Sequence, residues 1–396
     1  RLENVEKFDF ETVIERRGTS CVKWDQTGER FGVKDLFPMW VADMDFKAPE
    51  GVIQALRERV EHGIYGYTFH PESCWEAVTD WIARRHGWTV PSREWYAPTP
   101  GVVPALATAL LAFTQPGDRV IMQTPVYHPF WWVIESNGRR VASNPLKFDG
   151  ERYSLDLEDL ERKAADPRTK VLFFCSPHNP SGRVWTGAEL AAVTDICLRH
   201  DLLLVSDEIH ADIVYAPNRH RPIAAFVPEV ADRTITCMAP SKTFNIAGLA
   251  SSYAIIPDPA KRAAFRSFLH DNLDLSVNVF GIVGMEAAYR HGEAWLEALL
   301  KVLEGNLEFA DRFMRENIPG MKLVKPEGTY IPFVDCRGMG MDPQALADFL
   351  MYKAGVAMNA GTMFGPEGAG FARLNVATPR ALLEEGLGRI ARALSA

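Results

Sequence analysis

The stretch Thr234–Asn245, TITCMAPSKTFN, decides the fold of this chain. It begins as a short apolar strand, Thr234–Met238, and continues into a polar loop that carries Lys242. Ligands of open α/β sheets bind beyond the carboxyl ends of the strands, so a lysine in this loop can face a binding crevice. Most lysines instead lie on solvated helix faces, and the loop alone leaves that alternative open. An amine that is partly withdrawn from water in a crevice can attack an aldehyde cofactor.

Four more runs resemble the strand before Lys242, because they are mostly apolar rather than alternating. Such runs are typical of strands that are covered on both faces. They are Arg119–Gln123, Val171–Cys175, Leu202–Ser206 and Ser252–Ile256. Helical patterns lie between the strands or precede them, such as Pro49–His62, Pro71–His86 and Thr186–His200. The alternation predicts an α/β protein. After about Gly281 long helices dominate and 328–335 is expected to be a strand, which indicates a separate α+β unit.

Two polar segments follow the strands that precede Lys242 in the chain. Asp207 ends one strand and is followed by Glu208-Ile209-His210, whereas Asn179 lies in the turn-like segment 176–182. A carboxylate at the end of a buried strand needs a positive partner, which a protonated pyridine nitrogen would supply. A helix cap is the alternative for Asp207. Asn179 among prolines is most simply a turn residue, although its amide could also contact a ring oxygen.

Two further segments have the character of anion sites. Thr99–Pro104 opens an apolar helix that reaches about Phe113, and free N–H groups at a helix start bind phosphate. Gly101 permits close backbone approach, although many helices begin in this way. Arg373 lies in a strand-like apolar run, where an unpaired guanidinium would be costly. It could hold a substrate carboxylate by two parallel hydrogen bonds, or it could form a structural salt bridge.

The composition argues against several other classes of function. Apolar residues make up 47% of the chain, charged residues 24%, and the formal net charge is −8, which is ordinary for a soluble globular protein. No basic run suggests a nucleic-acid partner. No apolar stretch has membrane-spanning length, and the charged start, 1–10, does not read as a signal peptide. Because the sequence opens on Arg1, we expect it to have been processed or trimmed.

The cysteines indicate a reducing compartment. The six cysteines form no C-x-x-C pair, and no cluster of cysteine and histidine has the spacing of a zinc site. We therefore expect free thiols, no metal and a cytoplasmic location.

Taken together and in this order, the segments resemble the class I/II aminotransferase superfamily, the pyridoxal-phosphate (PLP) enzymes of fold type I. The resemblance covers nearly the whole chain. It implies a large domain, residues 51–285, in which helices sandwich a mostly parallel seven-stranded sheet. Residues 1–50 and 286–396 are then expected to form a smaller α+β domain. It also implies PLP as the cofactor, a small amino-acid substrate and a homodimer.

The resemblance assigns cofactor roles to four residues that carry polar groups or a ring. Lys242 is expected to form the Schiff base with the cofactor aldehyde, and Asp207 to pair with the pyridine nitrogen. Asn179 is expected to contact the ring 3′-oxygen, and Tyr127 to stack on the ring face.

A second group of residues is expected to hold the phosphate. Val102 and Val103, which follow Gly101, would donate backbone N–H groups, and Ser241 would help. Tyr67 looks like the tyrosine that reaches the phosphate of the neighbouring subunit, which implies the homodimer.

The substrate would lie beside these residues. Arg373 is expected to bind its α-carboxylate, with Asn179 and Ala42 also in contact. Tyr65 is the alternative to Tyr67 as the residue that crosses to the neighbouring subunit.

A finer resemblance is to the C–S β-lyase branch, the cystathionine β-lyase-like enzymes. It rests on Trp40–Phe46, Asp207–His210 and Ser241–Ile246. Many aminotransferases carry Tyr, a contact to the ring 3′-oxygen, where this chain has His210, and a phosphate-binding Arg where it has Ala250. Both departures look like the lyase branch. Ala239 stands where a phosphate-binding Ser is frequent, so the phosphate must depend more on backbone N–H groups.

The implied reaction is the cleavage of cystathionine or a related cysteine S-conjugate to a thiol, pyruvate and ammonia. Lys242 would remove the α-proton as a general base. An aminotransferase on the same fold is the main alternative, because both share every step up to the carbanion. A non-enzymatic binding or regulatory protein is the second.

The pocket for the substrate side chain is expected to draw on residues from two parts of the chain. They are Trp40, Asp43, Met44, Trp131 and the loop 358–364. The alternative interpretation of Trp131 and Trp132 is that both are ordinary aromatic residues of the core.

Overall fold

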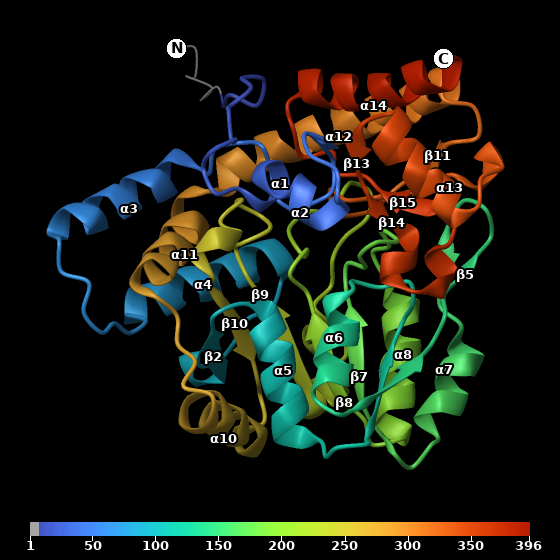
Figure 1. Ribbon diagram of the computed structural model, residues 1–396. Helices are drawn as coiled ribbons and strands as arrows, with labels where there is room; N and C mark the ends of the chain where they lie inside the picture. The colour runs from blue at the N-terminus through green and yellow to red at the C-terminus, as the bar shows by residue number, and fades with distance from the viewer. Residues whose placement is uncertain (1–7) are drawn as a thin grey trace.

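The structure, a computed structural model, describes residues 8–396. Residues 1–7, which belong to the charged start and to the predicted smaller domain, lie outside the described residues. A central seven-stranded sheet has the order β2-β10-β9-β8-β7-β3-β4 (Figure 1). β10 pairs antiparallel with β2 and β9, and the other four pairings of this sheet are parallel, so the predicted α/β fold with a mostly parallel sheet is confirmed. The strands are β2 (Tyr96–Thr99), β3 (Arg119–Met122), β4 (Arg140–Ser143), β7 (Thr169–Cys175), β8 (Leu203–Asp207), β9 (Thr234–Met238) and β10 (Ser252–Ile255).

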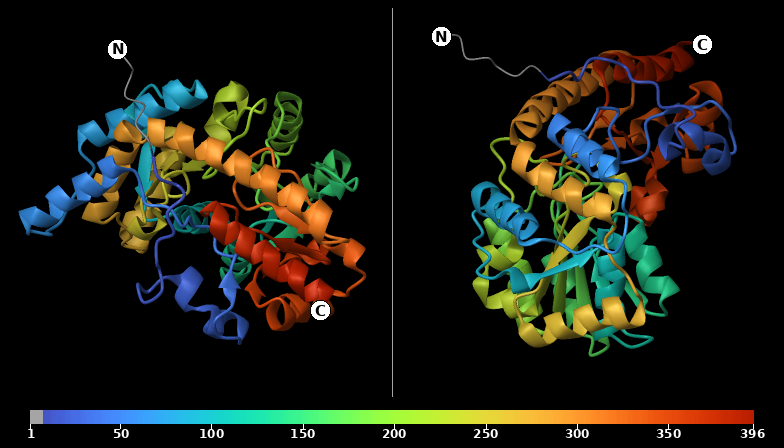
Figure 2. Two further views of the ribbon diagram at one scale, coloured as in Figure 1. Left: turned by 90° about the horizontal axis from the view of Figure 1, so that it is seen from above. Right: turned by 90° about the vertical axis from the view of Figure 1, so that its left-hand side faces the viewer.

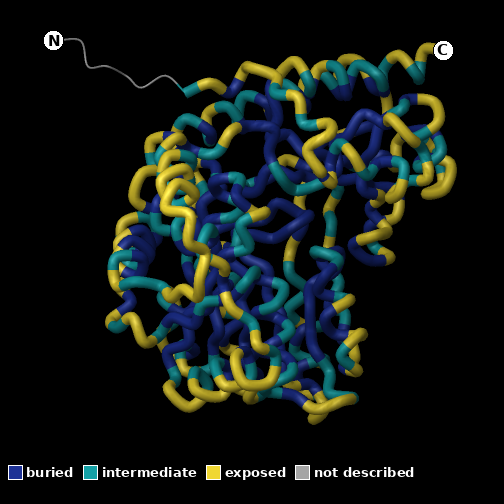
Figure 3. Tube along the Cα trace, turned by 60° about the vertical axis from the view of Figure 1, so that its left-hand side comes forward, coloured by how far each residue is buried: buried dark blue, intermediate teal, exposed yellow. Residues whose placement is uncertain are grey.

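Apolar side chains leave the strands toward both faces of this sheet. Phe173 of β7 packs in one core cluster with helices α5 and α6, whereas its neighbours Leu172 and Phe174 pack in another with α8. Successive side chains of a strand point to opposite faces, so a continuous apolar run is what two covered faces require. Figure 3 shows the result as a buried trace through the centre, with exposed segments at the periphery.

The helices that frame the sheet begin and end close to the sequence-based bounds. Helix α8 starts after Thr186, whose side chain accepts from the N–H of Glu189 while the Glu189 carboxylate accepts from the N–H of Thr186, a reciprocal cap. The helices of this part are α3 (Glu50–His62), α4 (Glu72–His86), α5 (Val102–Phe113), α6 (Pro129–Ser136), α7 (Leu157–Ala164), α8 (Gly187–Arg199), α9 (Ile223–Phe226), α10 (Pro259–Ser267) and α11 (Val279–His291).

A second group of elements gathers at one end of the sheet, where Figure 1 shows both the C-terminal helices and the short N-terminal ones. Figure 2 shows α12 and α14 crossing the molecule there. The helices are α1 (Val22–Asp25), α2 (Thr27–Phe31), α12 (Glu293–Asn317), α13 (Pro343–Asp348) and α14 (Arg380–Ser395). A four-stranded sheet has the order β11 (Lys322–Leu323), β12 (Phe333–Asp335), β15 (Phe371–Arg373), β14 (Asn359–Ala360). Short pairs join β1 (Phe37–Pro38) to β13 (Val356–Ala357), and β5 (Lys147–Phe148) to β6 (Tyr153–Ser154).

The expected strand over 328–335 is shorter than the sequence suggests. It begins only at Phe333, because Thr329 has a φ of 68°, which breaks the extended backbone, and Pro332 has no N–H to give to a ladder. The division at 285/286 stays a prediction, and it falls within helix α11. Within residues 8–396, none of the helices is both long and apolar enough to cross a bilayer.

Candidate active site

A cavity of about 180 Å³ opens beyond the carboxyl ends of β7 and β8 and next to the loop that follows β9. Most of the side chains and backbone groups that the sequence singles out line it, although their segments are far apart in the chain. They are Ala42, Gly101, Val102, Val103, Tyr127, Asn179, Asp207, His210, Ser241 and Lys242. The sheet therefore brings the separate motifs to one place, as parallel strands that share an edge must do.

Lys242 points from the loop after β9 into this cavity. Its Nζ donates a hydrogen bond of 2.8 Å to the carbonyl oxygen of Ala42. Burial, with the positive Arg373 nearby, lowers the pKa of Lys242 to about 8. A buried amine with a depressed pKa spends part of its time neutral near physiological pH, and the neutral form is the nucleophile and base.

Asp207 is the last residue of β8 and is buried. Its Oδ1 accepts from the N–H of Ile209 at 3.2 Å. Burial raises the pKa of Asp207 to about 7, with a contribution from the neighbouring Glu208, and Lys242 opposes the rise. A carboxyl group that is buried with so few donors suits a cationic ring nitrogen as its partner, because the positive charge would stabilise the ionised carboxylate.

The start of α5 also lines the cavity, through Gly101, Val102 and Val103. Gly101 has a φ of 127°, and a Cβ there would lie 3.2 Å from Pro104 Cδ, so the chain turns into the helix closely at this point. The N–H of Gly101 donates to Ser252 Oγ at 3.0 Å. Val102 and Val103 occupy the first turn, whose N–H groups have no partner within the helix and suit an anion.

Asn179, Tyr127 and Arg373 are held together. The N–H of Tyr127 donates to the carbonyl oxygen of Asn179 at 3.0 Å. Arg373 donates from one terminal nitrogen to Asn179 Oδ1 at 3.3 Å and from the other to the carbonyl oxygen of Trp40 at 3.0 Å. Because the Asn179 oxygen is engaged, its amide nitrogen is left to donate into the cavity.

Arg373 is buried, and among residues 8–396 no carboxylate lies within salt-bridge distance of it. Its Nε has no hydrogen-bond partner there either. Burial lowers its pKa to about 10. A structural salt bridge, the alternative left by the sequence, is therefore not what Arg373 makes within the described chain.

His210 and Tyr67 lie in opposite settings. His210 is buried at the cavity, and burial, together with Lys242 and Arg373, lowers its pKa to about 3, so its ring is neutral. Tyr67 lies on the extended loop between α3 and α4 with its side chain fully exposed, and it does not line the cavity. Tyr65 donates to the carbonyl oxygen of Val60 at 2.7 Å.

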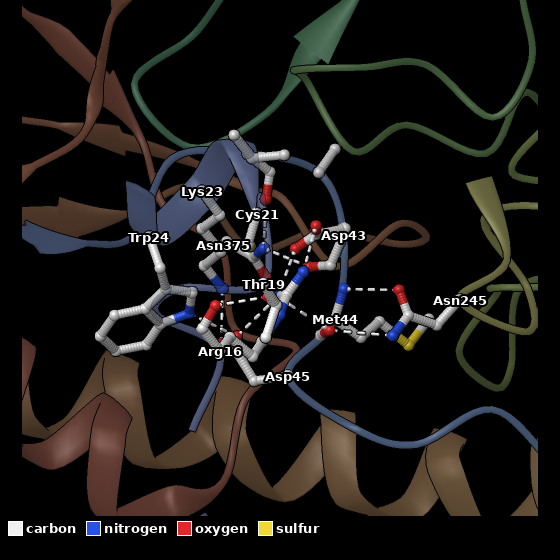
Figure 4. A network of polar contacts seen from close by, with 12 residues as sticks. Arg16, Thr19, Cys21, Lys23, Trp24, Asp43, Met44, Asp45, Asn245 and Asn375 are labelled. Atoms are coloured by element: carbon white, nitrogen blue, oxygen red, sulfur yellow. Dashed lines mark hydrogen bonds and ion pairs between the residues drawn. The ribbon is translucent and has the colours of Figure 1, made fainter. Parts of the chain in front are cut away.

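A polar network holds the segment around Ala42 against the cavity (Figure 4). Asn375 donates to the carbonyl oxygens of Val41 and Asp43, at 2.6 and 2.7 Å. Asn245 accepts from the N–H of Met44 at 3.0 Å and donates to its carbonyl oxygen at 2.9 Å.

The same segment is braced from the N-terminal side (Figure 4). Arg16 makes two hydrogen bonds to Asp43, and the buried Lys23 pairs with Asp45 at 2.6 Å. Burial opposes ionisation of Asp45, but Lys23, Trp24 and Arg16 outweigh it and lower its pKa to about 2.

Sequence reasoning misses Tyr330 as a residue of this site. Its hydroxyl donates to the carbonyl oxygen of Ala42 at 3.0 Å, the oxygen that also accepts from Lys242. The stretch 328–335 reads as a strand, in which a tyrosine is most simply a core residue. Thr329, before it, belongs to the residue types that rarely adopt a positive φ, and so gives no signal of the turn.

The two tryptophans at the start of α6 differ from the expected core pair. Trp132 is 57% exposed, so its interpretation as a core aromatic is wrong. Trp131 is half-buried. They are neighbours on a helix and point in different directions, so one faces the protein and the other faces solvent.

Comparisons with known proteins agree with this geometry. The family model described as aminotransferase class I and II matches residues 35–390. Cystathionine β-lyase PatB of Bacillus subtilis (strain 168) is 45% identical over 388 residues, which cover 98% of this chain and 100% of that protein.

Solved structures are similar over almost the whole chain. A PLP-bound putative aminotransferase from Clostridium difficile 630 has a TM-score of 0.95 and 42% identity, covering 98% of this chain and 100% of that one. The PLP-bound C–S lyase from Staphylococcus hominis has a TM-score of 0.91 and 33% identity, covering 98% and 99%. The chain therefore belongs to the class I and II aminotransferase family, within the branch that contains the C–S lyases.

Proposed function

We propose that this chain is a PLP-dependent C–S β-lyase, which cleaves cystathionine or a related cysteine S-conjugate to a thiol, pyruvate and ammonia. The observation that carries the proposal is the buried Lys242 amine, which faces the cavity lined also by Asp207. The full-length similarity to a cystathionine β-lyase supports the reaction class.

The described residues fit PLP. The first turn of α5, with Gly101 and Ser241 at its side, suits the phosphate, because a helix start offers free N–H groups. Asp207, with its raised pKa, suits a protonated pyridine nitrogen. Tyr127 lines the cavity and offers a ring face for stacking, and the amide nitrogen of Asn179 suits the ring oxygen.

When bound, PLP supplies an aldehyde that takes up an amino group and a ring that accepts the electron pair released at the substrate α-carbon. Lys242 would provide that amino group at rest, and its Nζ, when free, would take the α-proton of the substrate, for which a pKa of about 8 is well placed.

Arg373 and Asn179 orient the substrate. The Arg373 guanidinium has no carboxylate partner among residues 8–396, so it is free to bind the substrate α-carboxylate. The carbonyl oxygens of Ala42 and Trp40 fix the surrounding donors. Holding the carboxylate sets the direction of the bond from the α-carbon to hydrogen, and such orientation can contribute several kcal/mol to the rate.

The choice of lyase over aminotransferase rests on two residues as well as on the relative. His210 stands where many aminotransferases have Tyr, and it is neutral and buried. Ala250 lines the cavity at the position of a common phosphate-binding Arg, with a φ of 49°. The first departure changes a contact to the ring 3′-oxygen, and the second leaves the phosphate to the backbone of α5 and to the Ser241 hydroxyl.

The test feeds PLP-loaded enzyme with L-cystathionine and no amino acceptor, and couples pyruvate to lactate dehydrogenase. Steady release of pyruvate over many turnovers supports the lyase. A reaction that stops after one turnover without pyruvate would establish the aminotransferase instead. Lys242→Ala is expected to lose both the pyruvate and the visible absorbance band of the Schiff base. A band that survived in this variant would place the Schiff base on another residue.

A homodimer and a cytoplasmic location complete the proposal. Ile64, Tyr67 and Phe69 are 67%, 112% and 79% exposed on one loop, a concentration of apolar surface that a partner subunit would cover. In the dimer Tyr67 would reach the phosphate of the neighbouring subunit. All six cysteines are free and buried, which suits a reducing compartment.

A further inference from the structure

Polar atoms without partners gather next to the active site, where two segments face each other. The segments are 124–132, at the start of α6, and 361–368, before β15. Among residues 8–396, His128 Nδ1, Trp131 Nε1 and Glu367 Oε2 are buried side-chain atoms that have no hydrogen-bond partner. Burying such atoms unpaired is costly, so a polar partner that reached them would be stabilised.

The two segments are fixed to each other at their centre. The N–H of Val126 donates to the carbonyl oxygen of Phe364 at 2.8 Å, and the rings of His128 and Phe364 lie 5.7 Å apart. Gly365 has a φ of 134° and no Cβ, so the side chains of Glu367 and Trp131 can both come close to its backbone. A Cβ at this position would lie 2.9 Å from Glu367 Oε2 and 3.6 Å from Trp131 Cζ2. The carboxylate and the indole therefore lie close together on the side of Gly365 where a Cβ would project.

The cluster lies one ring beyond the residue that would bind the substrate α-carboxylate. The guanidinium carbon of Arg373 is 4.9 Å from the centre of the Phe364 ring, whose other neighbours include His128. In cystathionine five bonds separate the two α-carbons, a reach of about 6 Å by comparison with the ~3.4 Å that three bonds of extended backbone cover. A substrate held by Arg373 can thus place its far end among these atoms.

The three unpartnered groups include both a hydrogen-bond acceptor and hydrogen-bond donors. Glu367 supplies a carboxylate, which makes no ion pair within the described residues, 8–396. Trp131 supplies an N–H donor. Burial, with Arg373 nearby, lowers the pKa of His128 to about 4, so its ring is neutral and can offer a second N–H. An acceptor with a negative charge beside two donors matches an ammonium group beside a carboxylate.

We propose that Glu367, Trp131 and His128 form a distal subsite that binds the second amino-acid end of a cystathionine-like substrate. The Glu367 carboxylate takes the distal ammonium, and the Trp131 and His128 N–H groups take the distal carboxylate. This inference rests on the proposed lyase function and adds a substrate class to it. Substrates that end in a simple alkyl group gain nothing from these three residues.

The experiment compares L-cystathionine with S-methyl-L-cysteine, which has the same reacting half and no distal amino acid. In Glu367→Gln and Trp131→Phe we expect the KM for cystathionine to rise about tenfold, as for the loss of a charge-assisted hydrogen bond. We expect kcat for cystathionine, and kcat/KM for S-methylcysteine, to stay within about twofold. The matched control is Glu135→Gln, which changes an exposed carboxylate of α6 and should alter neither substrate.

A second readout follows binding without turnover, through the change that an amino-acid analogue makes in the visible absorbance band of the PLP-loaded enzyme. L,L-2,7-diaminosuberate has methylene in place of the cystathionine sulfur, and L-norvaline is the matching analogue of S-methylcysteine. Glu367→Gln should raise the dissociation constant of diaminosuberate about tenfold and leave that of norvaline unchanged. Equal losses for both substrates and both analogues, or none for cystathionine and diaminosuberate, would overturn the subsite. If the unaltered enzyme releases no pyruvate from either substrate, the lyase proposal fails instead, and the dissociation constants still report on the subsite.

Discussion

Lys242 and Tyr330 donate hydrogen bonds to the same acceptor, the carbonyl oxygen of Ala42, at 2.8 and 3.0 Å. The carbonyl oxygen thus holds the amine at the cavity, and the tyrosine hydroxyl helps to hold the carbonyl group. Tyr330 is buried, and burial raises its pKa well above the usual range, so it remains a neutral donor. The arrangement makes Tyr330 a positioning residue for the amine.

We expect Tyr330→Phe to lower kcat about fivefold, the worth of roughly 1 kcal/mol for one neutral hydrogen bond. It should also shift the pH at which the visible absorbance band of the loaded enzyme changes, because Lys242 is then held less firmly. The control is Tyr215→Phe, which removes a buried hydroxyl that donates to the carbonyl oxygen of Thr329 at 2.7 Å. If both variants behave alike, Tyr330 supports only the fold.

The contacts of Ala42 show where sequence reasoning ends. The strands and the polar residues that end them are local patterns, so the α/β fold and the gathering of Asp207, Asn179 and Lys242 follow from the sequence and from the rule about strand ends. Lys242 and Ala42 are 200 residues apart in the sequence, and Tyr330 and Ala42 are 288 residues apart. No local pattern contains such a pair, because the contact depends on how the N-terminal segment packs.

The exposure of Trp132 and the short strand at Phe333 have a different origin. In both places the residue types fit the expectation, since tryptophan favours cores and 328–335 is rich in strand formers. What differs is backbone geometry: the direction of one helix face, and the φ of 68° at Thr329. Side-chain propensity is a weak guide where tertiary packing or a turn decides.

The raised pKa of Asp207 predicts a pH dependence of the stability of the enzyme without PLP. The folded carboxyl has a pKa of about 7, raised from 3.8 chiefly by burial. Between pH 4 and 7 the folded protein therefore keeps a proton that the unfolded chain has lost, so the free energy of unfolding falls as the pH rises through this window. Lys242, lowered to about 8, acts only above that window.

Asp207→Asn removes this proton exchange. Taking the effect at low pH as the reference, we expect the variant without PLP to gain stability over the unaltered protein by about 1 kcal/mol at pH 4.5 and by about 4 kcal/mol at pH 7.5, from ~1.4 kcal/mol per pKa unit. Urea unfolding at the two pH values measures both differences. A constant difference at the two values would mean that Asp207 ionises normally in the folded protein.

The buried Lys23–Asp45 pair braces the segment that carries Ala42. Both side chains are almost fully buried, so Asp45→Asn leaves an unpaired ammonium group inside the protein. We expect the free energy of unfolding to fall by about 3–5 kcal/mol. Urea unfolding measures it, and Lys23→Met combined with Asp45→Asn should recover much of the loss, because no buried ammonium group remains and the amide oxygen can still accept from Trp24 and Arg16. The control is Glu15→Gln, in the exposed pair with Arg17, which should change stability by less than about 0.5 kcal/mol. A double variant as unstable as Asp45→Asn would contradict the buried-charge explanation.

Mixed dimers test whether Tyr67 serves the neighbouring subunit. If each site takes Lys242 from one subunit and Tyr67 from the other, Tyr67→Ala and Lys242→Ala homodimers are both impaired, for different reasons. A heterodimer of the two variants has one site with both residues intact. Unfolding and refolding an equal mixture should therefore restore lyase activity to about a quarter of the unaltered value, since random pairing makes half of the dimers mixed and one site in each is whole.

The decisive comparison is with the double variant, Tyr67→Ala with Lys242→Ala in one chain, refolded with the unaltered protein. If the tyrosine acts within its own subunit, each heterodimer has one site that lacks both residues and one whole site, in which Lys242 and Tyr67 both come from the unaltered chain, so an equal mixture reaches about half of the unaltered activity. If Tyr67 acts across the interface, that mixed dimer carries no whole site, and activity stays at the quarter contributed by unaltered homodimers. Restoration in the first mixture and none in the second would assign Tyr67 to the neighbouring site, whereas the reverse pattern would keep it in its own.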